Sequence, residues 1–167
     1  MNYHDIKKCD MLNGSGIRVS LWVSGCEHCC NQCQNPQTWD IDSGIPFDKE
    51  AEEELLEELS KDYISGITFT GGDPLHENNL EDVLNLVNKI RILLPEKTIW
   101  IYSGYKWDEI ETHPIRHGIV SMCDVLVDGR YTDDLRDITL KWRGSSNQRV
   151  IDVQKSLKEN KVILYEV

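Results

Sequence analysis

The sequence predicts an α/β protein built around a mainly parallel β-sheet. Segments with a strand pattern alternate along the chain with segments of helical periodicity. This alternation is typical of parallel strands joined by helical crossovers. In addition, each candidate strand is followed by a polar or glycine-rich motif. Because ligands bind at the carboxyl ends of parallel strands, we expect these motifs to meet on one face of the fold.

The individual elements follow from local patterns. Residues 17–23 alternate between apolar and polar side chains, which predicts the first strand. Asp48 is a candidate N-cap for a helix from Lys49 to about Ser60. The remaining expected elements are a strand at Ile64–Thr70, a helix at Leu80–Leu94 that Pro95 ends, a strand at Thr98–Tyr102, a short helix at Trp107–Glu111, a strand at Asp124–Val127 and a last strand at Lys161–Val167.

Length and charge restrict the class of protein. The chain has 167 residues, which suits one domain covering residues 1–167. Its formal net charge of −11 argues against a non-specific nucleic-acid binder and against attachment to anionic membrane surfaces. The sequence contains neither an apolar signal-peptide region nor a run of about 18 apolar residues. We therefore expect a cytoplasmic protein without a nucleic-acid or membrane partner.

The cysteines are concentrated in one short stretch. The chain has six, and four of them lie within residues 26–33. A secreted disulfide framework spreads its cysteines along the chain so that they link distant loops. A tight cluster in a cytosolic protein instead indicates a metal or redox site.

Three kinds of site are compatible with this spacing. Cys26, Cys30 and Cys33 offer three thiolates from one loop, which suits a four-iron cluster with one iron left open. Cys29 offers a fourth sulfur, but adjacent residues in a tight loop seldom face the same cluster. Two abutting CxxC pairs also allow structural zinc, although zinc sites usually separate their pairs. The third possible kind of site is a thioredoxin-like redox CxxC pair.

At these residues the sequence resembles a known family. Cys26-x3-Cys30-x2-Cys33 after the first strand resembles the radical S-adenosylmethionine (SAM) signature, and Gly71-Gly72-Asp73-Pro74 after the second resembles its GGE-type motif. Seven stretches between about residues 3 and 150 resemble the activating proteins of anaerobic (class III) ribonucleoside-triphosphate reductases. These stretches are Asn13–Arg18, Val23–Cys26, Ser43–Phe47, Gly71–Leu75, Tyr102–Tyr105, Val125–Gly129 and Trp142–Gln148.

The resemblance implies a fold, two cofactors and a partner. The implied fold is a partial, open radical-SAM-type β/α barrel that forms a single radical SAM domain. Cys26, Cys30 and Cys33 would hold one 4Fe-4S cluster, and its open iron would bind SAM. Reductive cleavage of SAM would give methionine and a 5′-deoxyadenosyl radical, which would take a hydrogen atom from a glycine of the reductase. The electron would come from a low-potential donor such as flavodoxin or ferredoxin.

The same resemblance names candidate SAM contacts at Gly71, Gly72, Asp73, Ser103 and Tyr105. Glycines permit a close approach of the backbone to a ligand, although a tight turn is the commoner use of such a pair. Asp73 stands where many relatives carry Glu, and its shorter side chain changes the reach of the carboxylate. Two alternative functions remain: activation of another glycyl-radical enzyme, and a non-catalytic module that binds zinc or an iron–sulfur cluster.

Overall fold

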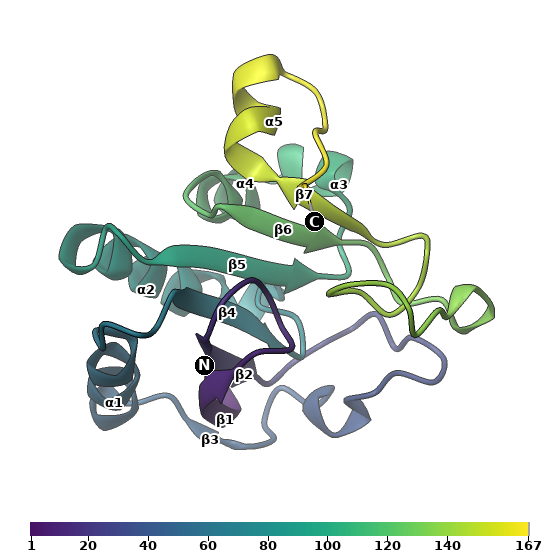
Figure 1. Ribbon diagram of the computed structural model, residues 1–167. Helices are drawn as coiled ribbons and strands as arrows, with labels where there is room; N and C mark the ends of the chain where they lie inside the picture. The colour runs from purple at the N-terminus through teal and green to yellow at the C-terminus, as the bar shows by residue number, and fades with distance from the viewer. Residues whose placement is uncertain (167) are drawn as a thin grey trace.

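A computed structural model describes residues 1–166, and its centre is a seven-stranded sheet in the order β3-β1-β2-β4-β5-β6-β7 (Figure 1). The strands are β1 (Asn2–Asp10), β2 (Arg18–Val23), β3 (Ile45–Pro46), β4 (Gly66–Gly71), β5 (Thr98–Ser103), β6 (Val125–Asp128) and β7 (Arg149–Asp152). The four strands β2, β4, β5 and β6 run parallel, whereas β1, β3 and β7 pair antiparallel to their neighbours. Because β3 and β7 form opposite edges, the sheet is open.

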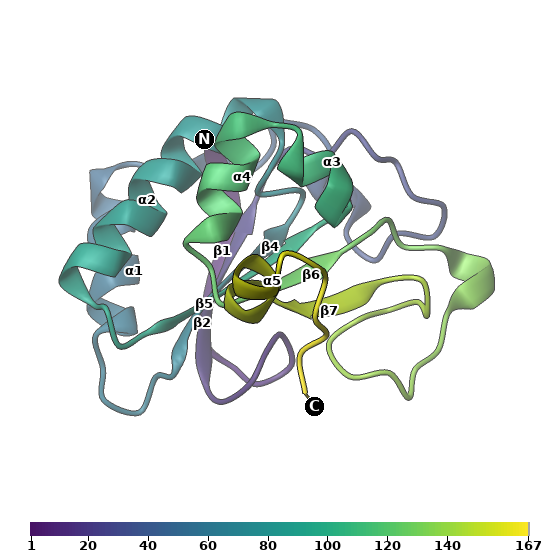
Figure 2. The same ribbon diagram turned by 90° about the horizontal axis from the view of Figure 1, so that it is seen from above.

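Helices cover one face of this sheet, as the view from above shows (Figure 2). They are α1 (Lys49–Leu59), α2 (Leu80–Leu93), α3 (Trp107–Glu111), α4 (Pro114–Ser121) and α5 (Val153–Glu159). The helices between the parallel strands bury their apolar sides against inward-facing strand residues such as Leu21, Phe69 and Ile101. Removal of this apolar surface from water is the main stabilising contribution to the fold. Within residues 1–166, no helix is both long and apolar enough to cross a membrane.

The opposite face of the sheet has a separate, smaller core. It consists of Trp100, Val125, Val127 and Val150, with Trp142 and Tyr165 packed against them. The rings of Trp142 and Tyr165 meet the ring of Trp100 edge-on, at centroid distances of 4.9 and 5.2 Å. The covering side chains come from an irregular loop and from the C-terminal segment, so no helix is needed on this side.

A buried arginine lies at the amino-terminal ends of the parallel strands. The Arg18 guanidinium donates to the hydroxyls of Thr68 and Thr98 and to the carbonyls of Ser15, Ile67 and Thr98. Burial lowers the pKa of Arg18 to about 10, so the side chain remains charged at neutral pH. Hydrogen bonds to neutral oxygens thus replace the hydration that this charge loses. Arg18 therefore holds the end of the sheet that lies away from the cysteines.

The expected α/β architecture is confirmed, including the helices and strands expected between residues 17 and 128, to within two residues at most ends. Asp48 caps α1 as expected, because its carboxylate accepts from the Ala51 amide at 2.9 Å. The strand expected at 161–167 is wrong. That segment makes one isolated bridge, between Leu164 and Ile151, and Val167 lies outside the described residues.

Candidate functional site

The motifs that follow the parallel strands meet at one end of the sheet, where the loops after β2, β4, β5 and β6 gather (Figure 1). One cavity is lined by three cysteines of the loop after β2 and by residues at or just after the ends of β4, β5 and β6. Its lining comprises Cys26, His28, Cys30, Cys33, Thr70, Gly71, Gly72, Asp73, Tyr102, Ser103, Gly104, Val127, Gly129, Arg130, Tyr131 and Gln148. The expectation that these distant motifs converge is therefore confirmed.

The cysteines divide into two groups by their position. Cys26, Cys30 and Cys33 are half-buried and line the cavity. Cys29 is exposed and does not line it. Burial raises the pKa of Cys26 to about 12, and it also raises the pKa of Cys30. The thiols of Cys26 and Cys30 are therefore protonated at neutral pH in the metal-free chain, and they must lose their protons to ligate a metal.

Gly71, the last residue of β4, and Gly72 after it allow the end of the strand to pass close to the cysteine loop. The Asp73 amide donates to the Gly25 carbonyl at 2.7 Å, and the Gly72 amide donates to the Val23 carbonyl at 2.8 Å. A Cβ at Gly72 would lie 2.6 Å from the Gly25 oxygen. Gly71 has a φ of 103°, in the left-handed region, where other residues are strained. The sequence Gly71-Gly72 is thus required by the backbone geometry beside the cysteine loop.

The carboxylate of Asp73 lies at the centre of a hydrogen-bond network. Its side chain is almost fully buried and accepts from the Leu75 amide at 2.8 Å and from the Gly104 amide at 2.9 Å. The Ser103 hydroxyl lies 3.0 Å from both carboxylate oxygens. His28 Nε2, from the cysteine loop, lies 2.6 Å from Oδ2. Asp73 thus connects the ends of β4 and β5 with the loop after β2.

Tyr105 makes a second connection to the same loop. Its hydroxyl donates to the Glu27 carboxylate at 2.6 Å, and its ring packs edge-on against His28 with centroids 4.6 Å apart. The guanidinium carbon of Arg116 lies 3.9 Å from the ring centroid. Unlike Ser103, Tyr105 is absent from the cavity lining. Burial, together with the hydrogen bond to Glu27, raises the pKa of Tyr105, which keeps its phenol protonated.

The donor set fits an iron–sulfur cluster. Three thiols of one loop surround one cavity, and thiolates are the usual protein ligands of such clusters. Among residues 1–166, no three His, Cys, Asp or Glu side chains are close enough to hold a single metal ion. A four-iron cluster binds each thiolate through a different iron, so it does not require the sulfurs to converge on one point. Tyr102 is also a lining residue, but its hydroxyl is fully buried and lies within reach of the charges of Asp10 and Arg18, away from the cysteines.

Several lining residues are absent from the sequence-based site. His28 was identifiable only by its place inside the cysteine loop. Thr70 and Tyr102 lie at the ends of β4 and β5, and Tyr102 packs against the smaller core on the face opposite the helices. Gln148 arrives from the loop before β7, where its side chain accepts from the Gly144 amide and donates to the Gly129 carbonyl. No local pattern in the sequence reveals that contact.

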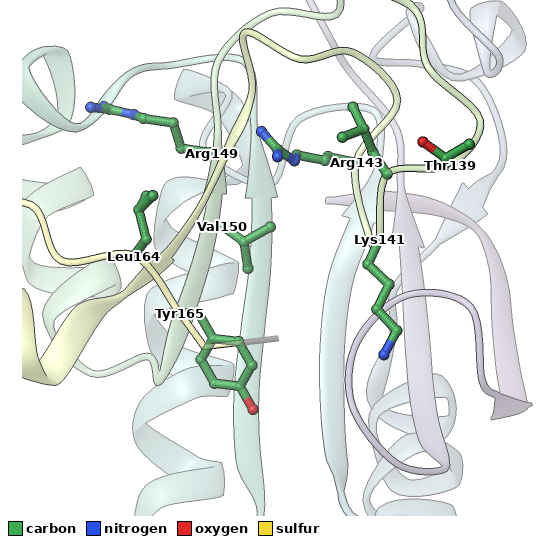
Figure 3. Close-up of a pocket in the computed structure, with 8 residues that line it drawn as sticks. Thr139, Lys141, Arg143, Arg149, Val150, Leu164 and Tyr165 are labelled. Carbon is green, nitrogen blue, oxygen red and sulfur yellow. The ribbon is translucent and has the colours of Figure 1, made fainter.

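A second hollow of about 420 Å³ lies beside β7 and the C-terminal segment (Figure 3). It is lined by Thr139, Leu140, Lys141, Arg143, Arg149, Val150, Leu164 and Tyr165. None of the candidate site residues belongs to it, and Arg143 is engaged by the carbonyls of Ser146 and Gln148. The cysteine cavity therefore remains the candidate site.

Comparison with known proteins identifies the family. The model of a family described as a 4Fe-4S single cluster domain matches residues 12–151. The anaerobic ribonucleoside-triphosphate reductase-activating protein of Escherichia coli K12 is 46% identical over 152 residues, which cover 90% of this chain and 97% of that protein. The protein of the same name from Enterobacteria phage T4 is 44% identical over 150 residues, covering 90% and 93%. That of Haemophilus influenzae is 39% identical over 150 residues, covering 89% and 96%. The chain therefore belongs to the family of anaerobic ribonucleoside-triphosphate reductase-activating proteins, and its residues 12–151 match the 4Fe-4S single cluster domain.

Proposed function

We propose that this protein activates an anaerobic ribonucleoside-triphosphate reductase by generating a glycyl radical on it, with a 4Fe-4S cluster and SAM as cofactors. The observation that carries the proposal is the convergence of Cys26, Cys30 and Cys33 with the ends of the parallel strands in one cavity. The high identity to reductase-activating proteins over most of the chain supports the choice of partner.

Each part of the site has a role in this proposal. Cys26, Cys30 and Cys33 would hold the cluster as thiolates and leave one iron open for the amino and carboxylate groups of SAM. The chemistry that a bound, reduced cluster would supply is the transfer of one electron to the sulfonium of SAM, which would give methionine and a 5′-deoxyadenosyl radical able to take a hydrogen atom from a glycine. The protein holds and orients these groups.

The strand ends supply the surroundings of SAM. The close passage of Gly71 and Gly72 beside the loop brings backbone carbonyls to the cavity, where they are able to accept from an ammonium group. Contacts of Asp73, Ser103 and Tyr105 with SAM stay predictions.

The open sheet fits a partial radical-SAM-type barrel that forms a single domain over residues 1–167. Four parallel strands with helical crossovers are the core of such a barrel, and its unclosed side would admit a segment of the reductase. We place the protein in the cytoplasm, where a low-potential donor such as flavodoxin or ferredoxin would supply the electron.

Electron paramagnetic resonance tests the proposal. The protein is reconstituted anaerobically with iron and sulfide, reduced, and measured with and without SAM. A four-iron signal that changes on addition of SAM is the expected result, because the open iron then takes a new ligand. A signal that SAM leaves unchanged, or stoichiometric zinc without sulfide, would overturn the proposal.

The partner is tested in a second step. The loaded protein, SAM and a reductant are mixed with anaerobic ribonucleoside-triphosphate reductase, and the glycyl radical is measured by its resonance signal. A different glycyl-radical enzyme serves as the control substrate. Radical formation on the reductase alone is expected, and formation on the control enzyme alone would favour the alternative activase.

A further inference from the structure

We propose that Asp73, Ser103 and Tyr105 hold the cysteine loop in place through His28 and Glu27, and so position the cluster ligands before any cluster binds. We call the four residues His28, Asp73, Ser103 and Tyr105 the loop anchor. The inference rests on the proposed function only in taking Cys26, Cys30 and Cys33 as the ligands. It gives Asp73 after β4, and Ser103 and Tyr105 at the end of β5, a positioning role in addition to any contact with a cofactor.

The position of His28 is the first step of the argument. It lies between Cys26 and Cys30 in the sequence, and its side chain is only 4% exposed although the loop around it is largely open. Its Nε2 lies 2.6 Å from the Asp73 carboxylate, which is itself 2% exposed. A buried polar pair of this kind is costly to separate, because either group would lose its partner away from water. The pair therefore fixes the middle of the cysteine loop.

The carboxylate of Asp73 is committed to internal partners. Two oxygens provide about four acceptor positions. The amides of Leu75 and Gly104, the Ser103 hydroxyl and His28 occupy them at 2.6–3.0 Å. The Ser103 hydroxyl in turn accepts from the Tyr105 amide at 3.1 Å. These contacts leave little acceptor capacity for a ligand, so the side chain acts mainly on His28.

Tyr105 anchors the neighbouring residue of the loop. Its hydroxyl donates to Glu27 at 2.6 Å, and its ring packs edge-on against His28. Two successive loop residues, both between Cys26 and Cys30, are thus held by the ends of β4 and β5. Because both strands lie in the middle of the sheet, they provide a rigid support for the loop.

Gly104 completes the geometry. A Cβ at this position would lie 2.3 Å from Cδ2 of His28, and the φ of Gly104 lies outside the left-handed region. An alanine would therefore displace the imidazole without straining the backbone. Gly118 in α4 provides the matched control, because a Cβ there would meet no atom within 4 Å.

The test uses the full-length, metal-free, reduced chain under anaerobic conditions. Its variants are Gly104→Ala, His28→Ala and His28→Gln, with Gly118→Ala as control. Alkylation of each cysteine by iodoacetamide is followed by mass spectrometry, and the melting temperature is measured in parallel. Gly104→Ala and His28→Ala should raise the alkylation rates of Cys26 and Cys30 roughly tenfold, which is the effect of losing about one buried hydrogen bond.

Two comparisons separate anchoring from general destabilisation. Buried Cys123 reports global opening and should react at the wild-type rate in every variant. His28→Gln should remain near the wild-type rates, because its amide retains a donor for Asp73. In addition, if Asp73 acts through His28, Cys26 and Cys30 should be alkylated no faster in the double variant Asp73→Ala/His28→Ala than in His28→Ala.

Two outcomes would overturn the inference: wild-type rates at Cys26 and Cys30 in both Gly104→Ala and His28→Ala, or an equal rise at Cys123. Neither result depends on a cluster, on SAM or on the reductase. An electron paramagnetic resonance signal that SAM leaves unchanged would therefore overturn the proposed function. The alkylation rates of Cys26 and Cys30 would still decide whether the cysteine loop is anchored.

Discussion

At the scale of single residues, the neighbours Cys29 and Cys30 differ in their surroundings. Cys29 adopts a φ of 49° and is exposed, whereas Cys30 lines the cavity. We therefore expect Cys29→Ser to keep the cluster. Replacement of Cys26, Cys30 or Cys33 by Ser should remove it or abolish SAM cleavage, because each change removes one thiolate ligand. Iron and sulfide per chain, together with the resonance signal of the reduced protein, provide the measurement.

Cys9→Ser is the matched control for this series, because Cys9 is an exposed thiol on β1 that does not line the cavity. Its iron and sulfide content should equal that of the wild type. Loss of the cluster in Cys29→Ser alone would show that our ligand assignment is wrong.

Asp10 predicts a pH dependence of stability. Burial disfavours its charge, but hydrogen bonds from the Ser20 hydroxyl, the Asn13 amide and the Leu12 backbone outweigh burial and lower the pKa of Asp10 below its usual value of 3.8. A carboxyl group whose pKa is lower in the folded state stabilises the fold at pH values above its unfolded-state pKa. This stabilisation is lost as the pH falls through the folded-state pKa. Asp10→Asn should therefore reduce the free energy of unfolding by about 2 kcal/mol at pH 7 and by clearly less near pH 3.

Denaturant titrations at the two pH values measure this difference. Asp5→Asn is the control, since Asp5 lies on the same strand and is exposed. An Asp10→Asn effect that is equal at both pH values would contradict the stabilising role of the ionised carboxylate.

The sequence predicts the ligand candidates of the site but not the contacts that hold them. Cys26, Cys30 and Cys33 are local in the chain, so their spacing is visible without a structure. The contact between His28 and Asp73 joins positions 45 residues apart and exists only because β2 and β4 are neighbours in the sheet. Parallel topology predicts that such motifs meet, but it does not predict which atoms pair.

At the scale of elements, the start of α1 depends on Asp48. Its carboxylate satisfies the Ala51 amide, one of the backbone donors that a helix leaves free at its N-terminus. Asp48→Ala should lower the free energy of unfolding by about 1 kcal/mol, measured by urea denaturation. Iron content per folded chain should not change, because Asp48 does not line the cysteine cavity.

Glu57→Ala is the control for the cap, since Glu57 is exposed in the second half of the same helix. An equal loss of stability in Glu57→Ala and Asp48→Ala would assign the effect to general surface charge. A change in iron content with Asp48→Ala would instead couple α1 to the site.

The elements without a sequence-based prediction have weak local patterns. β1 is polar and contains irregular register where it pairs with β2, so its apolar residues do not alternate regularly. α4 contains Gly118 and is only eight residues long. β7 spans four residues and passes directly into α5. Each of these elements is stabilised by its neighbours in space, and the patterns of strand and helix are too short to reveal it.

At the scale of the whole molecule, the two faces of the sheet are covered differently. Helices form between successive parallel strands, so their position on one face follows from the alternation that the sequence displays. The other face is covered by Trp142 and Tyr165, which belong to irregular segments. The prediction of a strand over 161–167 is wrong because this segment covers the sheet and does not belong to it. An apolar run that packs on a sheet has the same composition as a strand within the sheet.

Tyr165 therefore provides the test of how the second face is closed. Its ring contacts the rings of Trp100 and Trp142 edge-on at 5.2 and 5.9 Å, and its amide donates to the Val150 carbonyl at 2.8 Å. Tyr165→Ala should lower the free energy of unfolding by about 2 kcal/mol in a guanidinium titration, because it removes a large aromatic contact while the backbone bond remains. Tryptophan emission should shift to longer wavelength as Trp100 gains contact with water. Leu164→Ala removes a 59% exposed side chain from the same segment and should have little effect. Equal effects of the two substitutions would show that the C-terminal segment does not close this face of the sheet.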